Sequence, residues 1–174
     1  MLERLIITHA SPTLSRIKCS SLMCIRNTPI DNKTLRVLKA RGISSRIMRN
    51  RTGCPLLFLY RKEELERKIQ KEEEKALLTT FGYDTSSLDK ALTHLKKRLK
   101  EDNFPHEIGI FLGYPIEDVK SFIENSGRNY ILSGTWKVYH NEEKAKETFR
   151  EYEECTMKLL KEYEKGYTLE RLCV

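Results

Sequence analysis

Residues 104–119 read Phe104-Pro105-His106-Glu107-Ile108-Gly109-Ile110-Phe111-Leu112-Gly113-Tyr114-Pro115-Ile116-Glu117-Asp118-Val119. The apolar residues recur at helical spacing, Gly113 falls where a first helix must end, and Pro115 can open a second. The pattern predicts a helix-turn-helix-like segment over residues 104–126, in which Gly109 lets the two helices approach closely. A buried strand over residues 108–112 is the alternative, because periodicity alone does not assign a short apolar run.

The remaining patterns predict an α+β fold, a predominantly helical single domain over residues 1–174. Helices are expected over residues 2–8, from Ser11-Pro12 through about residue 25, and over 32–41, 62–80, 87–100 and 141–166. Two β-hairpins, 43–50 with 54–61 and 129–132 with 135–139, are expected to form a small antiparallel sheet. Pro55 suggests either an edge position for its strand or a bulge near the start of that strand, and Ile47 is expected to face the core.

The composition indicates a cytoplasmic protein without a membrane partner. The 174 residues are 33% charged with a mean hydropathy of −0.56, and no apolar run approaches the ~20 residues that a membrane helix needs. The amino-terminal apolar segment is too short for a secretory signal. The five cysteines are odd in number and include no Cys-x-x-Cys pair, which indicates reduced thiols, and the four scattered histidines predict no metal site.

The net charge of +7 is concentrated in the first third of the chain. Residues 1–61 hold twelve Lys or Arg against only Glu3 and Asp31, whereas residues 62–174 carry a small acidic excess. This asymmetry indicates an anionic partner for the first third, which can be a nucleic acid, a phosphorylated ligand or an acidic protein surface. The alternative is that the basic side chains only solvate exposed faces.

Two groups of candidate ligand-binding residues lie in this basic third. His9 stands at an expected helix junction before a proline-pinned loop that includes Thr13, so it is either a helix cap or a site residue. In the first hairpin, Arg49 and Arg51 fall on one face of the strand and could hold a phosphate or carboxylate in bidentate geometry. Simple solvation of these arginines is the alternative.

The central segment supplies the other candidates, His106, Glu107 and Tyr114. An imidazole near a carboxylate can hold a proton near neutral pH. Adjacent helix residues do not face each other, however, and Glu107 is also well placed to cap the helix that starts here. His106 is interpreted as either a site residue or a surface residue.

The favoured function is binding, with or without turnover, of a small anionic ligand near His9, His106 and the arginine-rich hairpin. No phosphate loop, nucleophile elbow or dinucleotide fingerprint is present, so the cofactor and any catalytic residue stay unassigned. A nucleic-acid-binding regulator is the first alternative, but the expected second helix offers three acids against Lys120, which a DNA duplex would repel. A non-catalytic protein-interaction module is the second alternative, and the oligomeric state is unassigned.

Three motifs together resemble a known family. They are His9-Ala10-Ser11-Pro12-Thr13-Leu14, the central stretch from Phe104 to Val119, and Trp136-Lys137-Val138-Tyr139. They are similar to an uncharacterised bacterial family, described as a domain of unknown function and met mainly in anaerobes. The resemblance spans almost the whole chain and implies a single-domain bacterial cytoplasmic protein. In the family's opening motif a cysteine often follows the histidine, and here that residue is Ala10.

Overall fold

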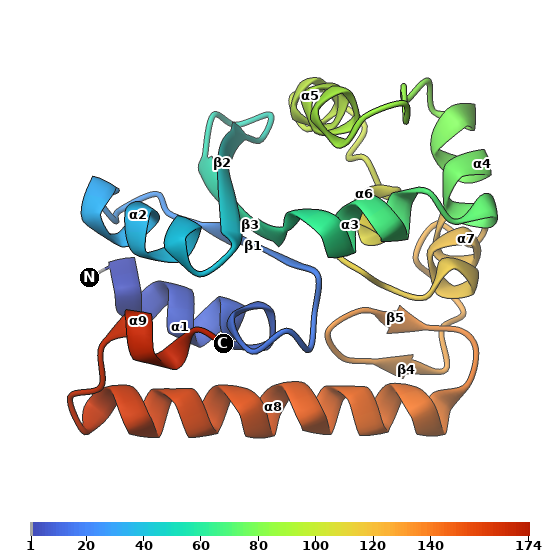
Figure 1. Ribbon diagram of the computed structural model, residues 1–174. Helices are drawn as coiled ribbons and strands as arrows, with labels where there is room; N and C mark the ends of the chain where they lie inside the picture. The colour runs from blue at the N-terminus through green and yellow to red at the C-terminus, as the bar shows by residue number, and fades with distance from the viewer. Residues whose placement is uncertain (1) are drawn as a thin grey trace.

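The computed structural model describes residues 2–174 and has an α+β architecture (Figure 1). Its helices are α1 (Leu2–Leu14), α2 (Asn32–Ala40), α3 (Lys62–Ile69), α4 (Glu72–Thr80), α5 (Leu88–Arg98), α6 (Ile108–Phe111), α7 (Ile116–Glu124), α8 (Glu142–Glu164) and α9 (Leu169–Leu172). Its strands are β1 (Ser20–Cys24), β2 (Ile43–Arg49), β3 (Pro55–Arg61), β4 (Leu132–Ser133) and β5 (Lys137–Val138). Both expected hairpins are present, but they form separate sheets.

The larger sheet has the order β1-β3-β2, and both pairings are antiparallel. Its central strand, β3, is buried on both faces: Leu57 and Leu59 belong to one core, and Phe58 and Tyr60 belong to the other. The expected edge position for this strand is therefore wrong. Pro55 is tolerated in the centre because it is the first residue of the strand, where its carbonyl still accepts a bond of 3.0 Å from the N–H of Ile25.

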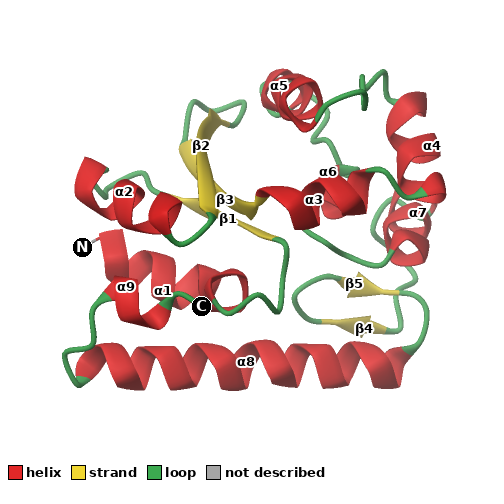
Figure 2. Ribbon diagram, in the orientation of Figure 1, coloured by secondary structure: helices red, strands yellow, loops and turns green. Residues whose placement is uncertain are grey.

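Helices cover both faces of this sheet (Figure 2). Side chains of α1, α2, α8 and α9 form one core with it, and side chains of α3 to α7 form the other. In β2, Met48 is fully buried in the second core while Ile47 is 40% exposed. The expectation that Ile47 faces the core is wrong, because the pairing of β2 with β3 turns its neighbour Met48 inward instead.

Three helix expectations also change. α1 runs through Pro12, which leaves the Thr8 carbonyl without its helical donor but at an exposed position where water can reach it. Residues 20–24 form β1 because they pair with β3. The charged run 62–80 breaks at Gln70 and Lys71 into α3 and α4. By contrast, the helical prediction for residues 108–112 is confirmed, since they form α6 and its C-cap.

The side chain of Arg61 joins several elements at the end of β3. It is 2% exposed and donates hydrogen bonds to the carbonyls of Thr13, Leu14, Arg41 and Val174 at 2.7–3.0 Å. Three of these carbonyls belong to the carboxyl ends of α1 and α2, where the helix dipole favours a cation. Arg61 therefore fixes both helices and the end of the chain to the sheet.

The longest helix, α8, has 23 residues and is charged along most of its length. Within residues 2–174, no helix is long and apolar enough to cross a membrane.

Candidate functional site

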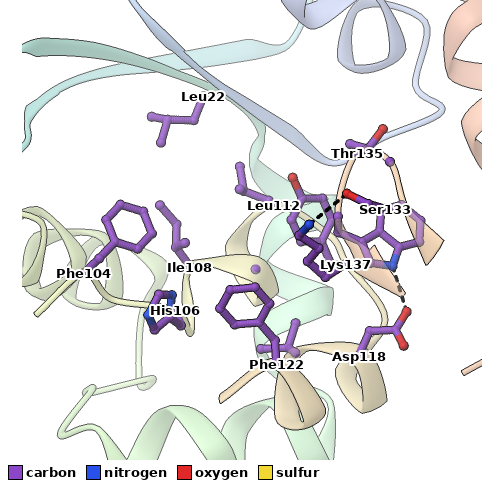
Figure 3. Close-up of a pocket in the computed structure, with 15 residues that line it drawn as sticks. Leu22, Phe104, His106, Ile108, Leu112, Asp118, Phe122, Ser133, Thr135 and Lys137 are labelled. Atoms are coloured by element: carbon purple, nitrogen blue, oxygen red, sulfur yellow. Dashed lines mark hydrogen bonds between the residues drawn. The ribbon is translucent and has the colours of Figure 1, made fainter. Parts of the chain in front are cut away.

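A cavity of about 310 Å³ opens between α6, α7 and the β4–β5 loop (Figure 3). Its walls are mostly apolar and aromatic, and we call it the aromatic cavity. The lining residues are Leu22, Phe104, His106, Ile108, Gly109, Leu112, Tyr114, Asp118, Val119, Phe122, Ser133, Gly134, Thr135, Trp136 and Lys137. Most of them belong to residues 104–119 or to the β4–β5 hairpin.

The floor of the cavity depends on the close approach of α6 and α7. A Cβ atom at Gly109 would lie 2.8 Å from Cγ2 of Val119 and 3.2 Å from Cδ2 of Tyr114. This confirms the expected role of Gly109, because any larger residue would separate the helices. Gly113 then turns the chain with a φ of +79°, a conformation that favours glycine, and the next residue, Tyr114, faces the cavity.

Asp118 fixes the wall opposite α6. Its side chain is 2% exposed and accepts a hydrogen bond of 2.7 Å from Nε1 of Trp136. Its other oxygen accepts hydrogen bonds from the backbone N–H groups of Tyr139 and His140, at 2.8 and 2.9 Å. The carboxylate thereby fastens the β4–β5 hairpin to α7 and sets the orientation of the indole. The sequence pattern predicted that Asp118 is one of several acids on an exposed helix face. It gave no indication of this buried structural role.

Besides Asp118, the polar side chains that line the cavity include Lys137 and His106. Nζ of Lys137 is 3.0 Å from Oγ of Ser133 and 3.7 Å from the ring centroid of Tyr130. No carboxylate oxygen within residues 2–174 lies within 4.0 Å of this ammonium group. The imidazole of His106 lies between two aromatic rings, with its centroid 5.5 Å from that of Phe104 and 4.9 Å from that of Phe122.

Tyr114 separates this cavity from a second, positively charged depression. Its ring stacks on Trp136 with centroids 5.2 Å apart, and burial raises the pKa of its hydroxyl to about 12. Nζ of Lys18 lies 5.2 Å from the Tyr114 centroid and 5.8 Å from that of Tyr152. A tyrosine that is neutral at physiological pH thus has the aromatic cavity on one side and a lysine on the other.

The depression, which we call the basic groove, has a volume of about 520 Å³. Its lining residues are Arg16, Ile17, Lys18, Cys19, Glu64, Arg67, Lys68, Lys71, Gly113 and Tyr152. They include five basic side chains and one acid. Burial lowers the pKa of Lys18 to about 8, and the groove supplies no carboxylate within ion-pair distance to compensate this amine.

The predicted site residues of the first third lie outside the aromatic cavity. His9 is exposed on α1, and Thr13 is buried with its hydroxyl 2.8 Å from that of Ser21. Arg49 donates to the carbonyl of Gly53 in its own hairpin turn. Arg51 instead forms an ion pair of 2.9 Å with an acid of the α5–α6 connection, Asp102. Each arginine thus contacts a different protein group, and an anion held by both of them stays a prediction.

In the central segment, His106 and Tyr114 line the aromatic cavity but Glu107 does not. The Glu107 carboxylate is 1% exposed and accepts hydrogen bonds of 2.9 Å from the Tyr83 hydroxyl and from Nε of Arg98. Burial and the Glu107 charge raise the pKa of Tyr83, and the bond to Glu107 raises that of Arg98. Glu107 makes no capping bond, so its expected role as a helix cap is wrong and it serves as a buried ion-pair partner.

The family model described as "Protein of unknown function (DUF3793)" matches residues 6–173. The chain belongs to this family. The match confirms the resemblance to a domain of unknown function, and the three quoted stretches fall within the matched DUF3793 region. Neither the curated proteins nor the solved structures contain a significant match. No group of three or more His, Cys, Asp or Glu residues within positions 2–174 of this DUF3793 chain is arranged to hold a metal ion.

Proposed function

We propose that this chain binds a small organic anion with a planar apolar body, and that the aromatic cavity is the binding site. The observation that carries the proposal is an apolar, aromatic-walled cavity lined by Lys137, whose ammonium group forms no ion pair with a carboxylate of residues 2–174. Its volume of about 310 Å³ is at the lower end of the ~300–1,000 Å³ found for small-molecule sites. The ligand class is therefore a compact ring with a short acidic group.

The shape of the cavity favours a flat ligand. Rings of Phe104, Phe122, Tyr114 and Trp136 contribute to its walls, and aromatic faces gain most from offset or edge-on contact with another ring. The indole of Trp136 is held by its hydrogen bond to Asp118. It also lies edge-on to the ring of Phe149, with the two ring centroids 4.6 Å apart. The walls are thus largely organised before a ligand arrives, which reduces the entropy cost of binding.

The charges of the lining residues favour an anion. Among residues 2–174, Asp118 is the only acid that lines the cavity. Its carboxylate accepts three hydrogen bonds from protein groups, so its charge is compensated by fixed donors. The ammonium group of Lys137 by contrast contacts the Ser133 hydroxyl and the Tyr130 ring, and neither of these carries a compensating negative charge. A ligand carboxylate would replace the hydroxyl of Ser133 as the acceptor for the ammonium group and form a charge-assisted bond. His106 adds a second donor near Phe104.

The single tryptophan of the chain makes this proposal directly testable. We expect benzoate, phenylacetate and cinnamate to change the fluorescence of Trp136, and each matching uncharged amide to bind more weakly. Replacing Lys137 by Gln should weaken binding of the acids by about ten-fold, the equivalent of one charge-assisted hydrogen bond, and leave the amides unaffected. Lys158→Gln, an exposed lysine on α8, is the matched control.

The proposal fails if none of these acids changes the Trp136 signal at concentrations up to about 1 mM, the weak end of specific recognition. It also fails if acids and amides bind equally well, because the charge of Lys137 would then play no part.

The basic groove supports a second candidate function, binding of an inorganic or organic phosphate. The specific observation is the half-buried Lys18, whose amine faces two aromatic rings and has no carboxylate partner within residues 2–174. Arg67 and Lys71 line the same groove and also form no ion pair with residues 2–174. Titration calorimetry with pyrophosphate should show binding that Lys18→Met abolishes and Lys39→Met, an exposed lysine of α2, does not.

Nucleic-acid binding through α7 has less support. Asp118 points inward, and Lys120, the one basic residue of this helix, forms an ion pair with Glu73. The exposed positions Glu117 and Glu124 leave an acidic helix face, which a phosphate backbone would repel.

A further inference from the structure

Two cysteines that are distant in the sequence meet beside the larger sheet. Cys24 ends β1, and Cys54 immediately precedes β3, its antiparallel neighbour. Their Sγ atoms lie 2.7 Å apart, although the residues are 30 positions apart in the chain. All five cysteines are free thiols in the structure, so this pair is close together without being bonded.

The backbone around the pair is fixed by hydrogen bonds on both strands. The N–H of Cys54 donates to the Asn50 side chain at 2.8 Å, and its carbonyl accepts the Asn50 N–H at 3.1 Å. The N–H of Ile25, next to Cys24, donates to the carbonyl of Pro55, next to Cys54, at 3.0 Å. The proximity of the two sulfur atoms is therefore a consequence of strand pairing and of the β2–β3 turn.

The two thiols differ in access. Cys24 is exposed, whereas Cys54 is 6% exposed. The hydrogen bond with Cys54, followed by the backbone N–H of Arg26, lowers the pKa of the Cys24 thiol. Since the thiolate is the nucleophile in disulfide exchange, Cys24 is the sulfur that an external reagent meets first.

We propose that Cys24 and Cys54 form a redox-active dithiol that is oxidised by low-molecular-weight disulfides to an intramolecular disulfide. The Cys24 thiolate attacks one sulfur of the reagent, the reagent's S–S bond breaks, and the first reagent thiolate leaves. The Cys54 thiolate, once its proton has passed to solvent, then attacks Sγ of Cys24 and displaces the second reagent thiolate. Two protein thiols lose two electrons, and the reagent disulfide is reduced to two thiols.

The other three cysteines lack this arrangement. The Cys155 thiol is buried and donates to the Ser15 hydroxyl at 3.3 Å. Burial raises the pKa of Cys173 to about 11 and also raises that of Cys19. Cys155 and Cys173 are buried and Cys19 is half-buried, and a raised pKa disfavours the thiolate, so we expect the reaction at the Cys24–Cys54 pair.

The test uses the full chain and oxidised glutathione as the reagent. After incubation and alkylation under denaturing conditions, the wild type should retain three alkylatable thiols, and peptide mapping should join Cys24 to Cys54. Cys54→Ser should instead accumulate one glutathione on Cys24, because no second thiol is present to displace it. Cys24→Ser should gain neither product at Cys54, and Cys155→Ser should behave as the wild type does.

Oxidation should also raise the melting temperature of the wild type, because a new cross-link closes a loop that contains α2 and β2. The reduced and oxidised wild-type proteins are compared directly, so this measurement does not depend on how well a variant folds. Five alkylatable thiols after incubation, a link between any other two cysteines, or a Cys54→Ser protein without glutathione on Cys24 would overturn the proposal.

Discussion

Replacing Arg61 by Met should cost about 4 kcal/mol of the free energy of unfolding. Met keeps much of the side-chain volume but has no donor for the four carbonyl oxygens that the guanidinium group contacts in the wild type. A buried carbonyl that loses its partner costs about 1–3 kcal/mol. Two of the four acceptors, those of Thr13 and Leu14, belong to buried residues, and a cost of about 2 kcal/mol for each gives the total. Water can reach the exposed residues Arg41 and Val174, so their oxygens add little.

Urea denaturation followed by far-ultraviolet circular dichroism measures this change. A loss of about 4 kcal/mol is a large part of the 5–15 kcal/mol that stabilises a typical domain, so the midpoint should fall sharply. Arg41→Met is the matched control, because the Arg41 side chain is exposed and only its carbonyl contacts Arg61. We expect the free energy of unfolding of this control to lie within about 0.5 kcal/mol of the wild-type value.

The free energy of unfolding of Arg61→Lys should lie between those of Arg61→Met and Arg41→Met. A lysine keeps the charge near the carboxyl ends of α1 and α2, but it cannot direct the donors of a planar fork at separate carbonyls. A loss below about 1 kcal/mol for Arg61→Met, with an unchanged denaturant slope, would show that the four carbonyls find other partners and would refute the reasoning.

Three further predictions concern the site. Gly109→Ala should cost about 1–3 kcal/mol in urea denaturation because its Cβ would lie 2.8 Å from Val119, and adding Val119→Ala should recover part of the loss. Asp118→Asn should lower the free energy of unfolding by about 2 kcal/mol and shift the fluorescence emission of Trp136 to longer wavelength. The reason is that an amide has one acceptor oxygen and cannot replace both carboxylate oxygens, which accept from Trp136 and from two backbone N–H groups. Unchanged emission would contradict this prediction. Pyrophosphate affinity should fall as the pH rises through about 8, where Lys18 loses its charge, and Lys18→Arg should remove this dependence between pH 7 and 9.

Features that depend on local sequence were predictable. The predicted helices over residues 32–41, 87–100 and 141–166 begin at or next to Asp31, Ser87 and Asn141, and in the structure these three side chains accept capping hydrogen bonds. The hairpin around the Arg51-Thr52-Gly53 turn was also found, because turn residues between two apolar runs specify it. In each case the deciding residues lie within a few positions of one another.

Features that depend on distant partners were not predictable. Residues 20–24 alternate too little to indicate a strand, and they form one because β3 lies beside them. Asp118 faces inward because its donors follow 18 to 22 positions later in the chain. Glu107 likewise meets Tyr83, 24 positions earlier. Local periodicity identified the segment that builds the aromatic cavity, but it did not identify which polar side chains hold that segment in place.

The strand order gives the arginines of the first hairpin a role beside solvation. β2 is an outer strand of its sheet, so one row of its backbone N–H and C=O groups has no strand partner. Such a row can recruit a strand from another molecule, and charged side chains along it oppose this addition. Arg46, which pairs with Asp89, and the exposed Arg49 both lie on β2. The long charged side chains along this border, with the Arg49 charge free of an ion pair within residues 2–174, would therefore oppose the joining of two copies of the chain through their sheets.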